Sequence, residues 1–356
     1  MSGLDLANTR LATPPREPLA ELTRPVLVDL AERLERRGWD LVADWFWGEA
    51  VLLQGILRVA AAREVEPPPR VLGWLEERRR AGVAIEHVNH VAPATAALMV
   101  APSDPVWRSL ADDLEHWLAG TVTRAPNGAI EHWPGGVWAD TVYMAGLFLA
   151  RLGVETGRPE LLAECGRQLL AHAEVLQDPG TGLYAHGSHD GVTIPCHWGR
   201  ANAWCALASV EFLELASASG LAERGQVEAV RDILGRQLRA LTGLQPEHGV
   251  WSVLVDDQPE TRGILETSAA AGIGAAMLRA PAVVPHLEAS VTEAGWRAVR
   301  GALAYVDPDG ALTRTSAGTV LQLVPFGYSV IRDDLPQLWG QGLALQAVAA
   351  ALEHLR

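Results

Sequence analysis

The sequence predicts an all-α protein in which helical hairpins form a ring around one core. Apolar residues recur at three- and four-residue spacing in about twelve segments, and clusters of Gly, Pro and Asp separate these segments. Hydrophobic residues make up 49% of the 356 residues, which is enough for one large core. Long and short connections alternate, so we expect the longer ends of the hairpins, and a pocket, on one side of the ring.

Start and stop signals support several of these helices. Pro105 follows the capping residue Asp104, and Pro159 follows Arg158; proline is favoured in the first turn of a helix. Gly220 follows a predicted helix end, where glycine is favoured because it adopts positive φ. The predicted helices cover residues 26–38, 42–62, 68–80, 88–101, 105–119, 137–153, 158–175, 199–218, 223–242, 264–279, 288–304 and 340–355.

The long connections are rich in Gly, His, Trp and Asp. Loops of this length inside a compact domain are usually functional. Within them, the runs 251–254 and 311–313 alternate in a way that predicts two short strands. The long connections are residues 121–136, 176–198, 244–263 and 305–339.

Residues 1–25 are rich in proline and polar side chains, and they contain no apolar stretch of signal-peptide length. We therefore expect a flexible N-terminal segment followed by a single domain over 26–356. Cys165, Cys196 and Cys205 are an odd number of cysteines and do not resemble a disulfide framework, which favours a cytoplasmic location. No window approaches eighteen uncharged apolar residues, so no membrane span is expected.

The charge of the chain excludes one class of partner. The formal net charge is −14, the pI is near 5.2, and the basic residues are scattered arginines without any lysine. Nucleic acids require clustered basic residues, so no nucleic-acid partner is expected. An anionic substrate needs a local arginine, because the overall field of the protein repels it. No pattern predicts the oligomeric state.

Two segments point to a carbohydrate site. Val137–Met144 and His197–Trp204 place aromatic, charged and amide side chains at the start of apolar helical patterns, where aliphatic residues are usual. Sugar rings stack on flat apolar faces, and their hydroxyl and carboxylate groups need fixed donors. Asp140 is an isolated carboxyl among aromatic residues, which is a setting that shifts a pKa.

Ordered motifs along the chain carry a resemblance to a known group of enzymes. The motifs are Val137–Ala150, Trp198–Trp204, Glu266–Ala271, Ser316–Thr319 and Gly340–Gly342. From about residue 40 to the C-terminus, their order resembles that of the unsaturated glucuronyl and rhamnogalacturonyl hydrolases, glycoside hydrolase families 88 and 105. The resemblance implies an (α/α)6 barrel of six helical hairpins, in agreement with the helix count, and a single catalytic domain over 26–356.

The resemblance also implies an activity. These enzymes remove a 4,5-unsaturated uronic acid from the non-reducing end of lyase-generated oligosaccharides, by hydrating its enol-ether double bond. They need no metal and no organic cofactor. By resemblance, Asp140 donates a proton to C4 and then, as the carboxylate, activates the water that adds at C5. The hemiketal opens and releases the aglycone. The source polysaccharide and the aglycone stay open.

Physical context supports this role for Asp140 and leaves an alternative. Trp138 and Tyr143 are expected to remove water from the carboxyl and to raise its pKa toward the working pH, as a general acid requires. Both are also predicted to contact substrate. In the alternative, Asp140 only caps its helix while Trp138 fills the core.

The second segment supplies further predicted contacts. Arg200 is expected to face the uronate carboxylate, because the planar guanidinium suits it. The alternative is a surface arginine that holds the loop to Asp190. Trp198 is expected to stack on the sugar, and Asn202 to line or support the site, whereas Trp204 is expected in the core.

Loop residues complete the predicted substrate site. By resemblance, His186 and His132 contact hydroxyl groups or the departing group, with solvated loop histidines as the alternative. Glu86 or Asn89 occupies the place where the family usually carries a second acidic residue near an Asn, and the choice between them stays open. A histidine often found before the last helix is Trp339 here, which points to an altered pocket.

One departure and several alternatives remain. The family's Arg-Gly-Asn/Gln pattern is Arg200-Ala201-Asn202 here. Zinc is disfavoured, because the spacing of Cys196 and Cys205 does not match a metal site. A sugar epimerase or isomerase would use paired histidines, for which the chain offers His186, His197 and His248. A non-catalytic carbohydrate-binding barrel is a further alternative.

A conventional two-carboxylate glycosidase would draw on Glu266 and Asp256, although a buried structural acceptor is the preferred role for Glu266. Motifs for Walker or dinucleotide loops, a Gly-x-Ser-x-Gly elbow and His-Glu-x-x-His are absent from the sequence, which disfavours nucleotide, serine-hydrolase and zincin chemistry.

Overall fold

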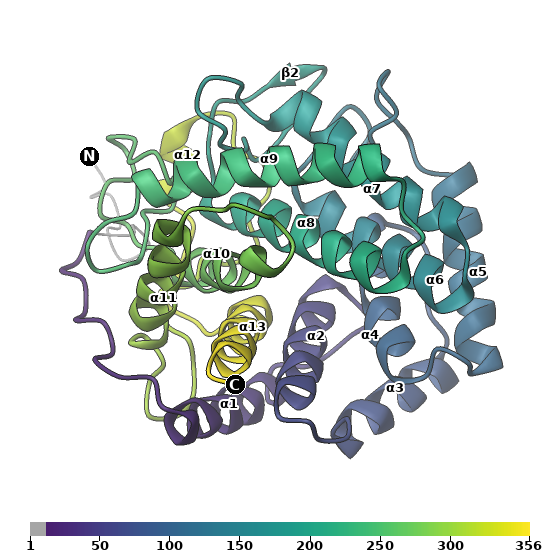
Figure 1. The fold of residues 1–356 in the computed structure, drawn as a ribbon, viewed down its shortest axis with the longest axis horizontal. Helices are drawn as coiled ribbons and strands as arrows, with labels where there is room; N and C mark the ends of the chain where they lie inside the picture. Colours follow the sequence, from purple (N-terminus) through teal and green to yellow (C-terminus); the bar gives the residue numbers. More distant parts are fainter. Residues whose placement is uncertain (1–11) are drawn as a thin grey trace, which may run out of the picture.

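The computed structural model describes residues 12–356, whose helices form an inner and an outer ring (Figure 1). Each inner helix contacts the next, and the last inner helix contacts the first, so the inner ring is closed. This arrangement confirms the predicted (α/α)6 barrel. The inner helices are α2 (Trp47–Ala62), α4 (Ala92–Val100), α6 (Leu147–Thr156), α8 (Gly199–Ser219), α10 (Thr267–Arg279) and α13 (Leu338–His354). The outer helices are α1 (Arg24–Trp39), α3 (Pro69–Ala81), α5 (Pro105–Gly120), α7 (Pro159–Leu176), α9 (Arg224–Gly243) and α11 (Ala289–Leu303).

Inner and outer helices differ in where their apolar residues lie. The outer helix α9 buries one face, with Val230, Leu234 and Leu238 at four-residue spacing, as an amphipathic surface helix does. The inner helix α13 is buried on all sides from Gly340 to Leu352, because neighbours surround it. Small residues permit this packing.

Two glycines set the crossing of α2 and α13. A Cβ on Gly342 would collide with the carbonyl of Val51, and a Cβ on Gly55 would meet the carbonyl oxygen of Gly342 at 2.5 Å. Backbone therefore packs directly on backbone at this crossing, and no larger residue fits either position without movement.

Three predicted helices begin later or are divided. The helix predicted over 42–62 begins at Trp47, because Glu49 Oε1 accepts the N–H groups of Ala43 and Asp44 at 3.0 Å and holds them outside the helix. The 88–101 helix is divided into the 3₁₀ turn η2 (Val88–His90) and α4. The 137–153 helix starts at Asp140 with the π-helical turn η3 (Val142–Gly146) before α6.

Two short elements have no counterpart in the prediction. Helix α12 (Pro325–Ser329) lies within the 305–339 connection, and the 3₁₀ turn η4 (Ala280–Ala282) follows α10. Single turns carry too little periodic pattern to stand out in the sequence.

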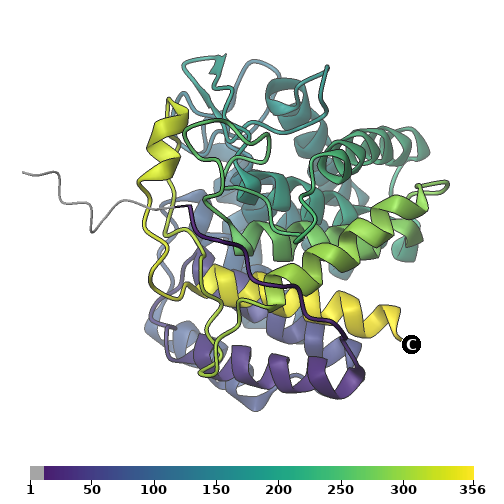
Figure 2. The ribbon, with the colours of Figure 1, turned by 90° about the vertical axis from the view of Figure 1, so that its left-hand side faces the viewer.

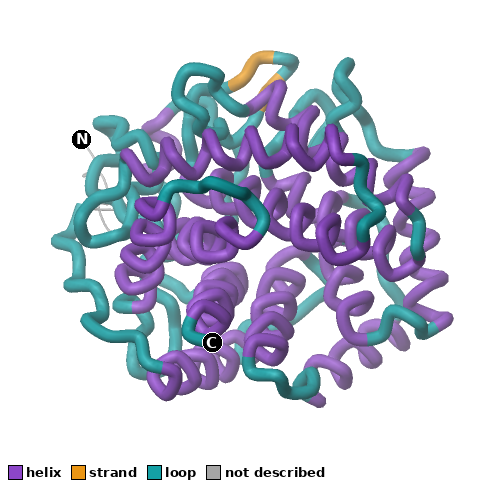
Figure 3. The backbone as a smooth tube through the Cα atoms, viewed as in Figure 1, coloured by secondary structure: helices purple, strands orange, loops and turns teal. Residues whose placement is uncertain are grey.

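The predicted strands over 251–254 and 311–313 are wrong. These residues make isolated bridges, Ser252 with Leu265, Leu254 with Trp198 and Leu312 with Val306, because each partner segment is met at one residue pair only. Within the described residues, the two-stranded sheet joins β1 (Ser188–His189) and β2 (Val192–Thr193) in the 176–198 connection (Figure 3).

The long connections gather at one end of the barrel, as predicted. Those over 121–136, 176–198, 244–263 and 305–339 each run from an outer helix to the start of the next inner helix. They therefore meet at the N-terminal ends of the inner helices. Figure 2 shows them on the side opposite the C-terminus, with the 305–339 connection at the left edge.

A partly buried ion network closes the other end. Arg279, at the end of α10, pairs with Glu211 and Glu214 of α8, both at 2.6 Å. Arg151 of α6 pairs with Glu211 at 2.8 Å, and Arg58 of α2 contacts both glutamates. Buried charges are tolerated only when they are paired in this way. The network therefore joins four inner helices.

The start of the described chain lies along α11. Leu19 N–H donates to Arg300 O at 3.2 Å, Arg16 N–H donates to Tyr305 Oη at 2.8 Å, and Leu22 is buried. Of the N-terminal segment predicted to be flexible, residues 1–11 lie outside the described residues. From residue 12 onward, no helix combines the length and the apolar character that crossing a membrane requires.

Candidate active site

Aromatic rings line the end of the barrel where the long connections meet. His132 stacks on Trp138 with ring centres 4.8 Å apart and planes at 11°. Trp138 lies 5.5 Å from His186, and His186 lies 4.2 Å from Trp198. Two connections, the one between α5 and η3 and the one between α7 and α8, are thereby brought together, and the four rings form one side of an arc.

Arg200 continues this arc. Its guanidinium lies 4.3 Å from the centre of the Trp198 ring and 5.5 Å from that of Trp339. Trp339, at the start of α13, stacks on Trp47, at the start of α2, with centres 4.3 Å apart. Trp47 is missing from the predicted site. Its sequence setting, with three aromatic residues at a helix start, resembles the two segments from which the carbohydrate site was predicted.

Asp140 lies beside this arc, next to His186. Its side chain is 14% exposed, and Oδ2 lies 3.4 Å from Nε2 of His186. The carboxyl accepts no hydrogen bond from the N–H groups of the first helical turn, so the capping alternative is not supported. The π-helical turn η3 follows directly, a local widening that is frequent at functional sites.

The pKa of Asp140 differs from the expectation. Burial raises this pKa, but the interaction with His186 and the charges of His132 and Arg200 lower it by more. The pKa therefore lies below the ordinary value of 3.8, and the prediction that the aromatic neighbours raise it is wrong for the free protein. The cause is the three basic side chains, His186, His132 and Arg200, that the fold brings close.

His186 has a second partner that the sequence did not reveal. Its Nδ1 lies 2.7 Å from the hydroxyl of Tyr328, which belongs to α12, and both side chains are fully buried. The 305–339 connection was expected to be functional because of its length. Tyr328 itself stands in the apolar run 323–331, where no pattern marks it as a site residue.

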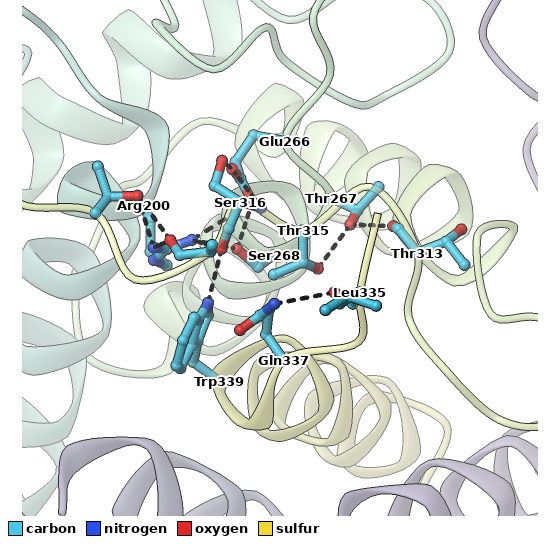
Figure 4. A network of polar contacts seen from close by, with 12 residues as sticks. Arg200, Glu266, Thr267, Ser268, Thr313, Thr315, Ser316, Leu335, Gln337 and Trp339 are labelled. Carbon is cyan, nitrogen blue, oxygen red and sulfur yellow. Dashed lines mark hydrogen bonds and ion pairs between the residues drawn. The ribbon is translucent and has the colours of Figure 1, made fainter. Parts of the chain in front are cut away.

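Arg200 fastens the connection before α13 (Figure 4). Its guanidinium is fully buried and donates to the carbonyls of Ser316 and Ala317 at 3.0 Å. Glu266 lies 3.7 Å away and accepts the N–H of Ser316 at 3.1 Å. Glu266 is thus a buried structural acceptor, as expected. The alternative in which Arg200 is a surface residue paired with Asp190 is wrong.

Asn202 and Tyr143 lie in supporting positions. The Asn202 amide accepts the N–H of Tyr184 at 3.0 Å and donates to the carbonyl of Tyr184 at 2.9 Å, so it holds the loop that carries His186. Tyr143 points into the core, where its hydroxyl accepts a hydrogen bond from Gln346 at 2.6 Å, and burial raises its pKa to about 12. Trp204 is fully buried, as expected.

The remaining predicted residues lie at the side of the arc. Glu86 is exposed, whereas Asn89 is half-buried in η2. The ring of His87 lies 5.0 Å from that of His132 and 4.3 Å from that of Trp133. A cavity of about 240 Å³ opens here, with both histidines, Glu86 and Trp133 in its wall. His132 is buried, and its Nδ1 shares a hydrogen bond with Thr141 Oγ1 at 3.1 Å. Burial lowers the pKa of His132 to about 3.

Other titratable groups have partners of their own. Asp256 lies 2.9 Å from His197 Nδ1 and also accepts from Gln258. His248 Nδ1 accepts the N–H of Val250 at 3.3 Å. The three cysteines are buried free thiols, and burial raises the pKa of Cys205 well above its usual value. Within residues 12–356, no three His, Cys, Asp or Glu side chains form a group that could hold a metal ion.

The barrel as a whole matches a known family of enzymes. The sequence profile of Glycosyl Hydrolase Family 88 matches residues 29–355. The chain belongs to glycosyl hydrolase family 88. The unsaturated rhamnogalacturonyl hydrolase YesR of Bacillus subtilis (strain 168) is similar to this family 88 chain, with 30% identity over 341 residues that cover 92% of this chain and 95% of YesR. The predicted family resemblance is thereby confirmed.

Solved structures show the same barrel as this family 88 chain. A possible member of the GH105 family from Salmonella enterica serovar Paratyphi A superposes with a TM-score of 0.84 at 24% identity, covering 97% of this chain and 100% of that one. The unsaturated glucuronyl hydrolase of Bacillus sp. GL1 superposes with a TM-score of 0.63 at 17% identity, covering 90% and 95%. At these identities the superpositions establish the fold.

Proposed function

We propose that this family 88 glycosidase removes a 4,5-unsaturated uronic acid from the non-reducing end of lyase-generated oligosaccharides, by hydrating its enol-ether double bond. The family and the similarity to an unsaturated rhamnogalacturonyl hydrolase support this activity. The observation that carries the proposal is the carboxyl of Asp140, which is 14% exposed beside the aromatic arc and lies 3.4 Å from Nε2 of His186.

One carboxyl group suffices for this reaction. Protonated Asp140 gives its proton to C4, and the electron pair of the ring oxygen stabilises the cation left at C5. The resulting carboxylate then takes a proton from the water whose oxygen bonds to C5. The hemiketal opens, the aglycone leaves, and the sugar becomes a keto acid. Asp140 ends the cycle in its protonated form.

The lowered pKa of Asp140 fits this cycle when the charge of the substrate is included. In the free protein the carboxyl is ionised near neutral pH, because His186 and Arg200 favour the charged form. A bound uronate brings a second negative charge and excludes water. Both effects raise the pKa of Asp140, so the carboxyl takes up its proton as the substrate binds.

Half-buried aromatic residues supply the surfaces for the sugar. Trp138, Trp339 and Trp47 each keep part of their ring accessible at the arc, and such rings stack on the apolar faces of sugars. The burial of Trp198 and Asn202 favours supporting roles, in which they hold His186 and Arg200 in place. The positive charge of Arg200 lies close enough to favour an anionic substrate at Asp140.

Competing mechanisms have less support. The carboxyls of Glu266 and Asp256, which a two-carboxylate glycosidase would use, accept hydrogen bonds from protein groups. His186, His197 and His248 each have separate partners, which disfavours a paired-histidine epimerase.

We also propose that residues 26–356 form the single catalytic domain and act without a cofactor in the cytoplasm. The closed inner ring supports one domain, and the three free thiols suit a reducing compartment. The net charge of −14 disfavours nucleic-acid partners.

The test is the ultraviolet absorbance of the conjugated enol ether. We expect the wild-type protein to abolish this absorbance in at least one member of a panel of lyase-generated oligosaccharides. Asp140→Asn should lower the rate by about 10³-fold or more, because the general acid and base is lost. Asp256→Asn is the matched control, since Asp256 pairs with His197, and should stay active. Near-normal turnover by folded Asp140→Asn would contradict the assignment.

A further inference from the structure

A chain of polar contacts runs from the connection before α13 to Asp140. The N–H of Gln322 donates to Tyr328 Oη at 3.4 Å, and the same Oη lies 2.7 Å from Nδ1 of His186. On the other side of the imidazole ring, Nε2 lies 3.4 Å from Oδ2 of Asp140. His186 is fully buried between these two contacts.

The positions of the protons along this chain of contacts follow from the donors. Burial raises the pKa of Tyr328 above its usual value, so the phenol keeps its proton near neutral pH. Its oxygen already accepts the N–H of Gln322, and its proton finds an acceptor in His186 Nδ1. The imidazole proton then lies on Nε2, facing the carboxylate. The opposite tautomer would turn a lone pair of Nε2 toward a negative charge.

We propose that Tyr328 is a positioning residue that holds the proton of His186 on Nε2 and thereby sets the proton affinity of Asp140. The proposal deepens the proposed function and rests on it for the role of Asp140. Tyr328 does not contact the substrate in this assignment, because its side chain is fully buried behind His186.

The ring of His186 is held independently of this hydroxyl. Its main chain accepts the N–H of Ala139 at 3.0 Å and donates to the carbonyl of Cys196 at 2.9 Å, and Trp198 lies 4.2 Å from the ring. Removing the hydroxyl therefore changes where the imidazole proton lies, while the ring stays in place. Tyr328→Phe is thus a test of the proton position and not of the fold.

Other charges act on the same carboxyl and must stay constant in the test. Around Asp140 these are His186, His132 and Arg200, and the thiol of Cys205 lies close as well. Next to Tyr328, the thiol of Cys196 is the further titratable group. None of them is altered by removal of the Tyr328 hydroxyl.

The first measurement is the tautomer of His186 by ¹⁵N NMR of histidine-labelled protein, with the His186 signals assigned by their loss in His186→Gln. We expect the Nε2–H tautomer in the wild type and a shift toward Nδ1–H in Tyr328→Phe. Tyr305→Phe is the matched control, because it removes another buried tyrosine hydroxyl that accepts a hydrogen bond, from Arg16, away from the arc. This control should leave the tautomer unchanged.

The second measurement is the pH profile of turnover. Without the phenol donor, a lone pair on Nε2 faces Asp140 for part of the time and favours the protonated carboxyl. We expect the alkaline limb of kcat to move up by about one pH unit, with little change in KM. Tyr305→Phe should reproduce the wild-type profile.

The outcomes separate this proposal from the proposed function. A wild-type Nδ1–H tautomer, or an unchanged tautomer and pH profile in Tyr328→Phe, overturns the positioning role even if Asp140→Asn is inactive. If the tautomer follows Tyr328 as expected while Asp140→Asn remains active, the contact chain stands and the catalytic role of Asp140 fails.

Discussion

The guanidinium of Arg200 lies 4.3 Å from the centre of the Trp198 ring, fully buried in a protein whose net charge is −14. A buried cation of this kind is stable only with hydrogen-bond acceptors around it, which Ser316 and Ala317 supply through their carbonyls. The same residue therefore fastens the connection before α13 and places a positive charge near Asp140.

Arg200→Lys should lower the free energy of unfolding by about 3 kcal/mol, because an ammonium cannot reach both carbonyls and stack on Trp198. Chemical denaturation measures this loss. Arg262→Lys is the control, since Arg262 pairs with Asp257 at the exposed surface. Equal stability of the two variants would show that Arg200 is not a structural anchor.

Gly342→Ala should fold poorly or lose about 3 kcal/mol of stability, because the added Cβ would collide with the carbonyl of Val51 where α13 crosses α2. Gly73→Ala, in the outer helix α3, should be neutral or slightly stabilising, since a Cβ there meets nothing within 4 Å. Thermal unfolding of both variants checks the contrast. A mild effect at Gly342 would mean that the two inner helices can separate.

Stability should fall on acidification through Glu214. Burial raises the pKa of Glu214, but the charge and hydrogen bond of Arg279 and the charge of Arg58 lower it by more, so it lies below the ordinary value of 4.5. A carboxyl with a lowered pKa in the folded state stabilises the protein above pH 4.5, and this stabilisation is lost as the pH falls through the folded-state pKa.

Unfolding free energies measured across this acid range should show a flatter pH dependence for Glu214→Gln than for the wild type. Glu228→Gln, which removes a glutamate paired with Arg231 on the outer surface, should keep the wild-type slope. Parallel curves for all three proteins would contradict the assigned role of the network.

Substrate binding should be coupled to proton uptake by Asp140. The pKa of this carboxyl lies below its ordinary value in the free protein, and a bound uronate raises it by like-charge repulsion. Calorimetry with a saturated uronate disaccharide, in buffers of different ionisation enthalpy, measures the number of protons taken up on binding. We expect between zero and one proton per chain, and this number should increase as the pH is lowered from roughly pH 7 to pH 5. Asp140→Asn should bind without this uptake. Binding that takes up no proton in the wild type would contradict a proton-donating Asp140.

Much of the fold could be read from local pattern. Helix α9 repeats its apolar residues at the helical period, and the Pro105 and Gly220 signals stand where α5 begins and α8 ends. Short elements could not be predicted from local pattern. The five residues of α12 carry no full period, and the isolated bridges near Ser252 are decided by distant partners.

The sequence by itself determined the helical barrel and the family, and it singled out Asp140 as the candidate acid, because periodicity and motif order are properties of neighbouring positions. Only the tertiary structure decided the pKa of Asp140, the burial of Arg200 and the pairing of His186 with Tyr328. Each of these depends on through-space distances between residues up to 142 positions apart. Electrostatic interactions follow those distances and not the order of residues along the chain.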